Sequence, residues 1–194
     1  MLSPWGRAAP RVRCAIDRWT GAGWRLVERH EIAAPGPPAA ALAALASVPL
    51  RELPAVRALF ALRGLRFSAG MTLRDFFSTP PFVLLEEDRG RELVFGILVP
   101  PRDGAGRRRA PATPAEHRAA LPRAPLAATG SFGAEAKGTT SLLWTETWVR
   151  TNGRLAASAF GAYWLAIGPF SAWIRRMFLR AGRRRADLAA RHGA

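Results

Sequence analysis

Residues 139–179 constrain the fold most, because a strand-like run leads there directly into a long apolar helix. Thr139–Arg150 alternates in side-chain type, as a strand with one buried face does. An apolar, tryptophan-rich segment follows and ends in an arginine cluster. A β-strand that leads into a long C-terminal amphipathic helix indicates a sheet curled around that helix, a shape that encloses an apolar pocket.

The alternation assigns the side chains of this strand to two faces. We interpret one face as the core face, because β-branched residues suit the pleat and threonine tolerates partial burial; it carries Leu143, Thr145, Thr147 and Val149. The opposite face carries Trp144, Glu146, Trp148 and Arg150. Alternation therefore favours a surface charge at Glu146. If its face were the concave one, Glu146 would instead orient a polar group of a ligand.

The last element is predicted to be helical, with one apolar stripe. Steps of three and four residues connect Phe160, Trp164, Ile167, Phe170, Ile174, Phe178 and Ala181. Pro169 removes the hydrogen bond to the Leu165 carbonyl, so we expect a kink near Gly168. The arginines of this region are predicted to lie mainly off the stripe: Arg175, Arg176, Arg180, Arg183, Arg184 and Arg185.

The remaining elements follow from local patterns. We expect a loosely ordered extension over 1–22, a strand from Trp24 to Ile32, a short helix over 38–47 and a second helix from Pro54 that stops at Gly64. Thr72 begins a capped turn. Two strands follow over 82–88 and 91–99, and a hairpin partner over 126–136. Residues 100–125 hold six prolines and six arginines, which predicts mostly loop, with a short helix capped by Thr113 and Glu116.

Composition bounds the class of protein. A chain of 194 residues is long enough for one domain and short for two, and 49% hydrophobic residues fit a globular protein. Its one cysteine, Cys14, excludes an internal disulfide, and no apolar signal-peptide core begins the chain. A reducing cytoplasm is the expected location.

The net charge of +15 raises the question of nucleic acid. Lys137 is the only lysine, and Arg, Ala, Gly and Pro all have GC-rich codons, so genome composition explains much of the excess. Aromatic residues do not interleave with Arg107–Arg109 or Arg183–Arg185, and no zinc spacing accompanies them. We expect no specific nucleic-acid binding, only salt-sensitive nonspecific contact.

The order of these elements resembles the START-like, helix-grip superfamily, also called SRPBCC, and most closely an uncharacterised bacterial branch of it. The residues that carry the likeness span 24–186: Leu53–Phe60, Arg63–Leu65, Phe82–Leu85, Gly90–Gly96, Thr145–Thr147, Tyr163–Trp164 and Ile174–Arg176. The resemblance implies an α+β domain over 23–190, in which a seven-stranded antiparallel sheet grips the terminal helix around a pocket. Superfamily members include lipid carriers, hormone receptors, aromatase/cyclases and oxygenase subunits, so the fold does not decide function. The proline- and arginine-rich segment 100–125 departs from the pattern.

Catalytic chemistry has little support in the sequence. His30, His117 and His192 lie far apart, no serine sits in a Gly-x-Ser-x-Gly elbow, and no His–Cys grouping has metal-ligand spacing. We expect neither a metal ion nor a cofactor. A cyclase or dehydratase on the same fold remains an alternative, for which Tyr163, Glu146 or His30 would have to lie inside the cavity.

The function that we predict is noncatalytic binding of a small hydrophobic or amphipathic molecule, lipid-like or polyketide-like, between sheet and terminal helix. The predicted pocket-lining residues are Phe95, Leu143, Thr145, Thr147, Phe160, Tyr163, Trp164 and Ile167. Leu155–Ile174 holds no charged residue, but its large side chains fall on one stripe, which favours a grip helix over a membrane span. A third alternative is a membrane-surface or interaction protein that uses Trp144, Trp148, Trp173, Phe178 and the arginines against anionic lipid.

Overall fold

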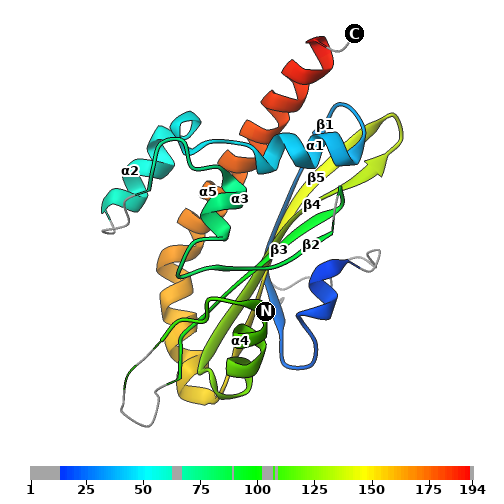
Figure 1. The fold of residues 1–194 in the computed structure, drawn as a ribbon. Coiled ribbons are helices and arrows are strands. Elements are labelled where there is room, and N and C mark those ends of the chain that lie inside the picture. Colours follow the sequence, from blue (N-terminus) through cyan, green and yellow to red (C-terminus); the bar gives the residue numbers. More distant parts are fainter. Residues whose placement is uncertain (1–13, 63–66, 89, 102–106, 108, 193–194) are drawn as a thin grey trace, which may run out of the picture.

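The structure, a computed structural model, describes residues 14–62, 67–88, 90–101, 107 and 109–192. Within these residues the chain is α+β, and its strands form one open antiparallel sheet (Figure 1). The strands are β1 (Arg25–Ala34), β2 (Val83–Asp88), β3 (Glu92–Leu98), β4 (Leu126–Lys137) and β5 (Thr140–Thr151). Their order in the five-stranded sheet is β1-β5-β4-β3-β2. The α+β class is therefore as expected.

The helices are placed between and after these strands. They are α1 (Pro38–Ala46), α2 (Pro54–Leu62), α3 (Leu73–Phe77), α4 (Pro114–Ala120) and α5 (Arg154–His192), with 3-10 turns η1 (Ala15–Arg18), η2 (Leu50–Glu52) and η3 (Leu121–Arg123). The boundaries predicted from capping residues hold at α3, where Thr72 accepts from Asp75 N, and at α4, where Thr113 accepts from Glu116 N. The helix stop expected at Gly64 lies outside the described residues.

The main core lies between one sheet face and the helices. α5 packs against α1, β1 and β5, and α1 also packs against β4 and β5 (Figure 1). Gly182 makes the α1–α5 contact possible, since a Cβ there would lie 2.8 Å from Leu45 Cβ. Phe132 and Leu143 from the sheet and Phe178 from α5 are fully buried in this core. The C-terminal half of α5 is thereby fixed over the sheet.

The opposite face of the sheet is covered in part by η1. Ile16 and Trp19 are buried against Val83 and Leu85 of the edge strand β2 and Val94 of its neighbour β3. Of the loose extension expected over 1–22, the described part therefore includes a segment packed on the sheet, and residues 1–13 lie outside the description. An apolar residue pair at Ile16 and Trp19 is enough to dock a short turn, because both side chains leave water.

The sheet is smaller than the resemblance implies. Within the described residues it has five strands, against the seven of a helix-grip fold. In the segment 100–125, where a further strand was in doubt, α4 and η3 occupy the described part. Pro100 and Pro101 lack the amide donors that a ladder needs, which explains why β3 does not extend into this segment.

The terminal helix continues through Pro169 as one 39-residue element and changes direction along its course (Figure 1). Its stripe differs from the expected one at two positions. Phe170 is 49% exposed, whereas Arg175 is 9% exposed and faces the sheet. Steps of three fall short of the 3.6-residue turn, so the run Trp164–Ile167–Phe170 drifts off the buried face, and Ser171 takes the inward position instead.

Candidate ligand pocket

A cavity of ≈ 510 Å³ lies between the sheet, the phenylalanines that α2 and α3 contribute, and the N-terminal half of α5. This volume is in the range of small-molecule sites. Its lining is mainly aromatic and aliphatic; the phenylalanines are Phe60, Phe76, Phe77, Phe82, Phe95, Phe132, Phe160 and Phe178. The few polar side chains of the lining are Thr147, Tyr163, Trp164, Ser171 and Arg175. The cavity is therefore an apolar space with a small number of hydrogen-bonding groups.

Most of the predicted pocket residues line this cavity. They are Phe95, Thr147, Phe160, Tyr163, Trp164 and Ile167. Tyr163 is 52% exposed, so its ring belongs to the mouth of the cavity. The ring of Trp164 stacks on that of Phe160, with 5.5 Å between centroids, and the two form part of the helical wall.

Leu143 and Thr145 are the two predicted residues that do not line the cavity. Both face the helices, as the alternation predicted, but each is fully buried. Leu143 pairs with Ile32 and Ala134 at the end of the sheet that α1 covers, so packing fills the space over it. Thr145 lies beneath the guanidinium of Arg175, to which its hydroxyl is bonded. The correct face was predicted here, but not the limits of the cavity along it.

Among the lining residues that the sequence reasoning missed, Arg175 is the charged one. Its Nη1 donates to Thr145 Oγ1 at 2.6 Å, and its Nε lies 3.8 Å from Glu28 Oε2. The guanidinium carbon is 5.7 Å from the ring centroids of both Phe95 and Phe132. Burial lowers the pKa of Arg175, and the charges of Glu28 and Glu146 oppose that effect. A signal existed, because Ile167, Ser171, Arg175 and Phe178 follow each other at helical spacing.

Gly130 makes room for this arrangement. A Cβ at Gly130 would lie 2.6 Å from Phe95 Cζ and 3.1 Å from Arg175 Nη2. Gly130 is directly opposite Thr147 in the β4–β5 ladder, so the two positions share one place on the cavity floor. The Thr147 hydroxyl is buried and has no hydrogen-bond partner among the described residues. The bare backbone of Gly130, the buried guanidinium of Arg175 and the unsatisfied hydroxyl of Thr147 thus belong to one part of the cavity lining.

A second set of polar side chains joins α5 to β1 beside the cavity. Ser171 Oγ donates to Glu28 Oε2 at 2.9 Å, and the other oxygen of Glu28 lies 2.6 Å from His30 Nε2. Arg176 Nε lies 3.5 Å from His30 Nδ1. Of these residues Ser171 alone lines the cavity. His30 therefore serves the attachment of the helix to the edge strand and is not placed among the lining residues.

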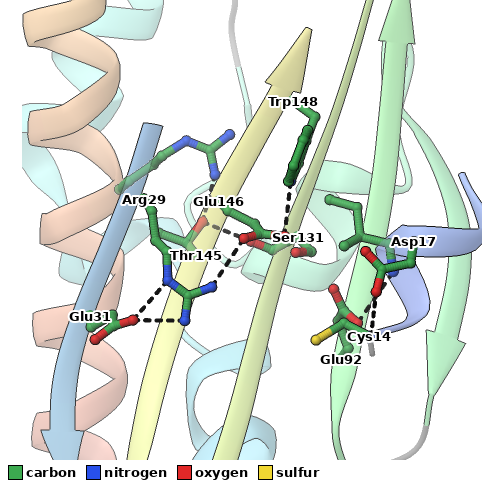
Figure 2. A network of polar contacts seen from close by, with 11 residues as sticks. Cys14, Asp17, Arg29, Glu31, Glu92, Ser131, Thr145, Glu146 and Trp148 are labelled. Atoms are coloured by element: carbon green, nitrogen blue, oxygen red, sulfur yellow. Dashed lines mark hydrogen bonds and ion pairs between the residues drawn. The ribbon is translucent and has the colours of Figure 1, made fainter. Parts of the chain in front are cut away.

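Glu146 contradicts the prediction of a surface charge, because its side chain is fully buried. Arg29 Nη1 donates to one carboxylate oxygen and Trp148 Nε1 to the other, both at 3.0 Å (Figure 2). Arg29 also bonds Glu31, so the buried carboxylate is joined to the surface by one bridging cation. Burial is possible because Glu146 is paired and hydrogen-bonded, a compensation that alternation alone does not reveal.

Trp144 and Trp148, which share this face of β5 with Glu146, are also more buried than the outward position predicted for them implies. Trp144 is 3% exposed, because its ring lies over Gly133, where a Cβ would be 2.3 Å from Trp144 Cζ2. Arg29 covers the ring from above at 5.2 Å from its centroid. Trp148 is half-buried and packs beside η1. The Trp144 ring is therefore not part of the outer surface, whereas Trp148 keeps part of its surface exposed.

Two further titratable groups lie outside the cavity. Glu92 is 2% exposed, and burial raises its pKa to about 7 although Ile16 N donates to it. His117 on α4 is fully buried against Gly96, and burial lowers its pKa to about 4. In the part of the chain that the structure describes, no three His, Cys, Asp or Glu side chains group as metal ligands.

The N-terminal half of α5 exposes several apolar side chains, of which Tyr163 lines the cavity at its mouth. Those exposed are Leu155, Tyr163, Leu165, Phe170 and Trp173. By length and composition α5 would also pass as a membrane span, with 11% of its most apolar 18-residue window buried. Core helices of soluble proteins are mostly buried in such a window, so this half of α5 has a face that the described residues do not cover.

A scan against protein-family models and a search of curated proteins both find no match for this chain.

Proposed function

We propose that this protein binds a small hydrophobic or amphipathic molecule in the cavity between the sheet and α5. The observation that carries the proposal is the cavity itself, ≈ 510 Å³ lined mainly by phenylalanine and aliphatic side chains. Burying apolar ligand surface there contributes roughly 25 cal/mol per Å² before the costs of ordering the ligand. A lipid-like or polyketide-like molecule has the apolar surface to use it.

The fold class that we propose is a reduced helix-grip domain. In its support, the long terminal helix packs on one face of an antiparallel sheet whose first and last strands, β1 and β5, are neighbours. The two short helices α1 and α2 follow the first strand, as the resemblance implies. The difference is the smaller number of strands within the described residues.

Binding without reaction fits the lining better than catalysis does. Among the described residues, those that line the cavity include no Asp, Glu, His or Cys. Of the three candidates for a cyclase or dehydratase, Tyr163 lines the cavity, whereas Glu146 and His30 do not. Proton transfer needs a positioned base and usually a second group that orients it. Tyr163, half exposed at the mouth, has no such partner in the lining.

The test is direct identification of a bound molecule. Native mass spectrometry of the protein purified from its own host is expected to show a co-purifying apolar mass that organic extraction removes. Ala128→Phe places a ring in the cavity, since Ala128 lines it, and should abolish the co-purifying mass. Ala189→Phe, at an exposed site near the end of α5, is the matched control and should retain it. A wild-type protein that carries no ligand and binds no apolar probe would refute the proposal.

Contact with an anionic membrane surface is a second candidate, and a specific observation favours it. The uncovered apolar side chains of α5 include Tyr163 at the cavity mouth, and the exposed arginines Arg154 and Arg176 flank them along the helix. A surface of this kind suits the headgroup region of an anionic bilayer. Binding there would bring the mouth next to a store of apolar ligands, so the two candidate functions are compatible.

A further inference from the structure

The geometry points to a carboxylate head group on the ligand, held by Arg175 and Thr147 at the cavity floor. This inference rests on the proposed function, since it assigns a chemical class to the molecule in the same cavity. It makes the ligand an amphipathic monoanion, an apolar body with one carboxylate.

The first argument is the unused hydrogen-bonding capacity of Arg175. A guanidinium has five N–H donors. Among the described residues it makes one hydrogen bond, to Thr145, and one looser ion pair with Glu28. Glu28 Oε2, which faces Nε of Arg175, also accepts from Ser171, and the other oxygen contacts His30, so this carboxylate has further partners of its own. The Nη2 side of Arg175 is left for a ligand.

The second argument is the position of that free side. Nη2 lies over Gly130, where the missing Cβ makes room for the guanidinium and for the Phe95 ring. Thr147, opposite Gly130 in the ladder, has a hydroxyl that is buried and unpartnered among the described residues. Both Arg175 and Thr147 line the cavity. A buried polar atom without a partner costs stability, and a ligand oxygen at this point would satisfy it.

The third argument concerns which anion fits. The planar donor fork of arginine matches the two oxygens of a carboxylate. Among the described residues of the lining, Arg175 is the one charged side chain. Glu28 already offsets part of its charge, so a doubly charged phosphate would leave more uncompensated negative charge in this buried place than a carboxylate would. The phenylalanines around the guanidinium, Phe95 and Phe132, exclude water and strengthen the pair.

The test compares decanoate, decanol and decyl phosphate by isothermal titration calorimetry on the full chain at about pH 8, where a free carboxylate is ionised. The expected order is decanoate bound at least tenfold more tightly than decanol, with decyl phosphate weaker than decanoate. Thr147→Val should weaken decanoate by about tenfold and leave decanol unchanged, as loss of a hydrogen bond to a charged group does.

Thr129→Val is the matched control. Thr129 is also buried, its hydroxyl is also unpartnered among the described residues, and it does not line the cavity. It should leave all three affinities unchanged. The double variant Glu28→Gln/Arg175→Met removes both buried charges together and should bind decanoate and decanol equally.

The outcomes separate the two proposals. Equal affinity for decanoate and decanol, or a Thr147→Val variant that binds decanoate as the wild type does, overturns the carboxylate assignment and leaves the apolar pocket standing. Tighter binding of decyl phosphate than of decanoate also overturns it. If none of the three probes binds, the proposed function fails, and this inference fails with it.

Discussion

The guanidinium of Arg175 donates to the hydroxyl of Thr145, with 2.6 Å between Nη1 and Oγ1, and this bond connects α5 to β5. The same hydroxyl donates to the carbonyl of Ser131 at 2.8 Å, so the contact continues into β4. Thr145 is fully buried, and water cannot replace either bond. One threonine therefore joins the terminal helix to two neighbouring strands.

Thr145→Val should destabilise the protein by about 1–3 kcal/mol, because it leaves buried polar partners without their bonds. Thr147→Val is the matched control two residues along the same face, where the hydroxyl has no partner among the described residues. We expect its unfolding free energy to stay within about 0.5 kcal/mol of the wild type or to rise. Urea unfolding at pH 7 measures both. Equal stability of the two variants would remove the structural role given to Thr145.

Much of the fold was predictable from local sequence. Thr72 and Thr113 marked helix starts through the side-chain caps that they form. Alternation located β5, and β4 was expected as its hairpin partner. The face of β5 that meets α5 was also correct, since Thr145 bonds to Arg175 and Thr147 and Val149 line the cavity. Capping and alternation are local, so they are visible without the fold.

The burial of charged residues was not predictable in the same way. Glu146 and Arg175 are buried because partners distant in the chain, Arg29 and Glu28, compensate them. Pairs separated by more than a hundred residues leave no periodic trace in the sequence. The outward face of β5 was misjudged for a similar reason, because the space over Gly133 that accommodates Trp144 is a property of the neighbouring strand.

Glu92→Gln should change the pH dependence of stability. Burial raises the folded-state pKa of Glu92 from 4.5 to about 7, so the folded chain holds this proton more tightly than the unfolded chain does. The contribution is favourable at low pH and is lost as the pH rises from 4.5 through 7, by at most about 3 kcal/mol. The variant should therefore gain stability relative to the wild type between pH 5 and 8, measured by chemical unfolding at several pH values.

Glu86→Gln is the control for this pH effect. Hydrogen bonding to Arg18 lowers the pKa of Glu86, so its stabilising contribution is present above 4.5 and is lost as the pH falls. Between pH 5 and 8 its difference from the wild type should stay constant. A constant difference for Glu92→Gln over the same range would show that Glu92 titrates normally in the folded chain.

Gly130→Ala should both destabilise the protein and weaken ligand binding. The added Cβ would lie 2.6 Å from Phe95 Cζ, so the ring or the strand must move, at a cost of about 1–3 kcal/mol. Gly161→Ala is the matched control, because Gly161 is an exposed helical position with nothing within 4 Å of the added atom. That substitution should add about 0.5–1 kcal/mol. Thermal unfolding compares them, and equal effects of the two would contradict the close packing at Gly130.

The uncovered face of α5 can be tested with vesicles. Phe170→Ser/Trp173→Ser removes two exposed rings and should release the protein from vesicles that contain anionic phosphatidylglycerol in a flotation assay. Leu188→Ser changes a side chain that is 56% exposed further along the same helix and should float as the wild type does. Binding should also fall when the salt concentration rises, because the flanking arginines attract the lipid charge over a screened distance. Equal flotation on anionic and on neutral vesicles would show that these arginines do not recognise lipid charge, and no flotation on either kind would show that the α5 face does not bind a bilayer.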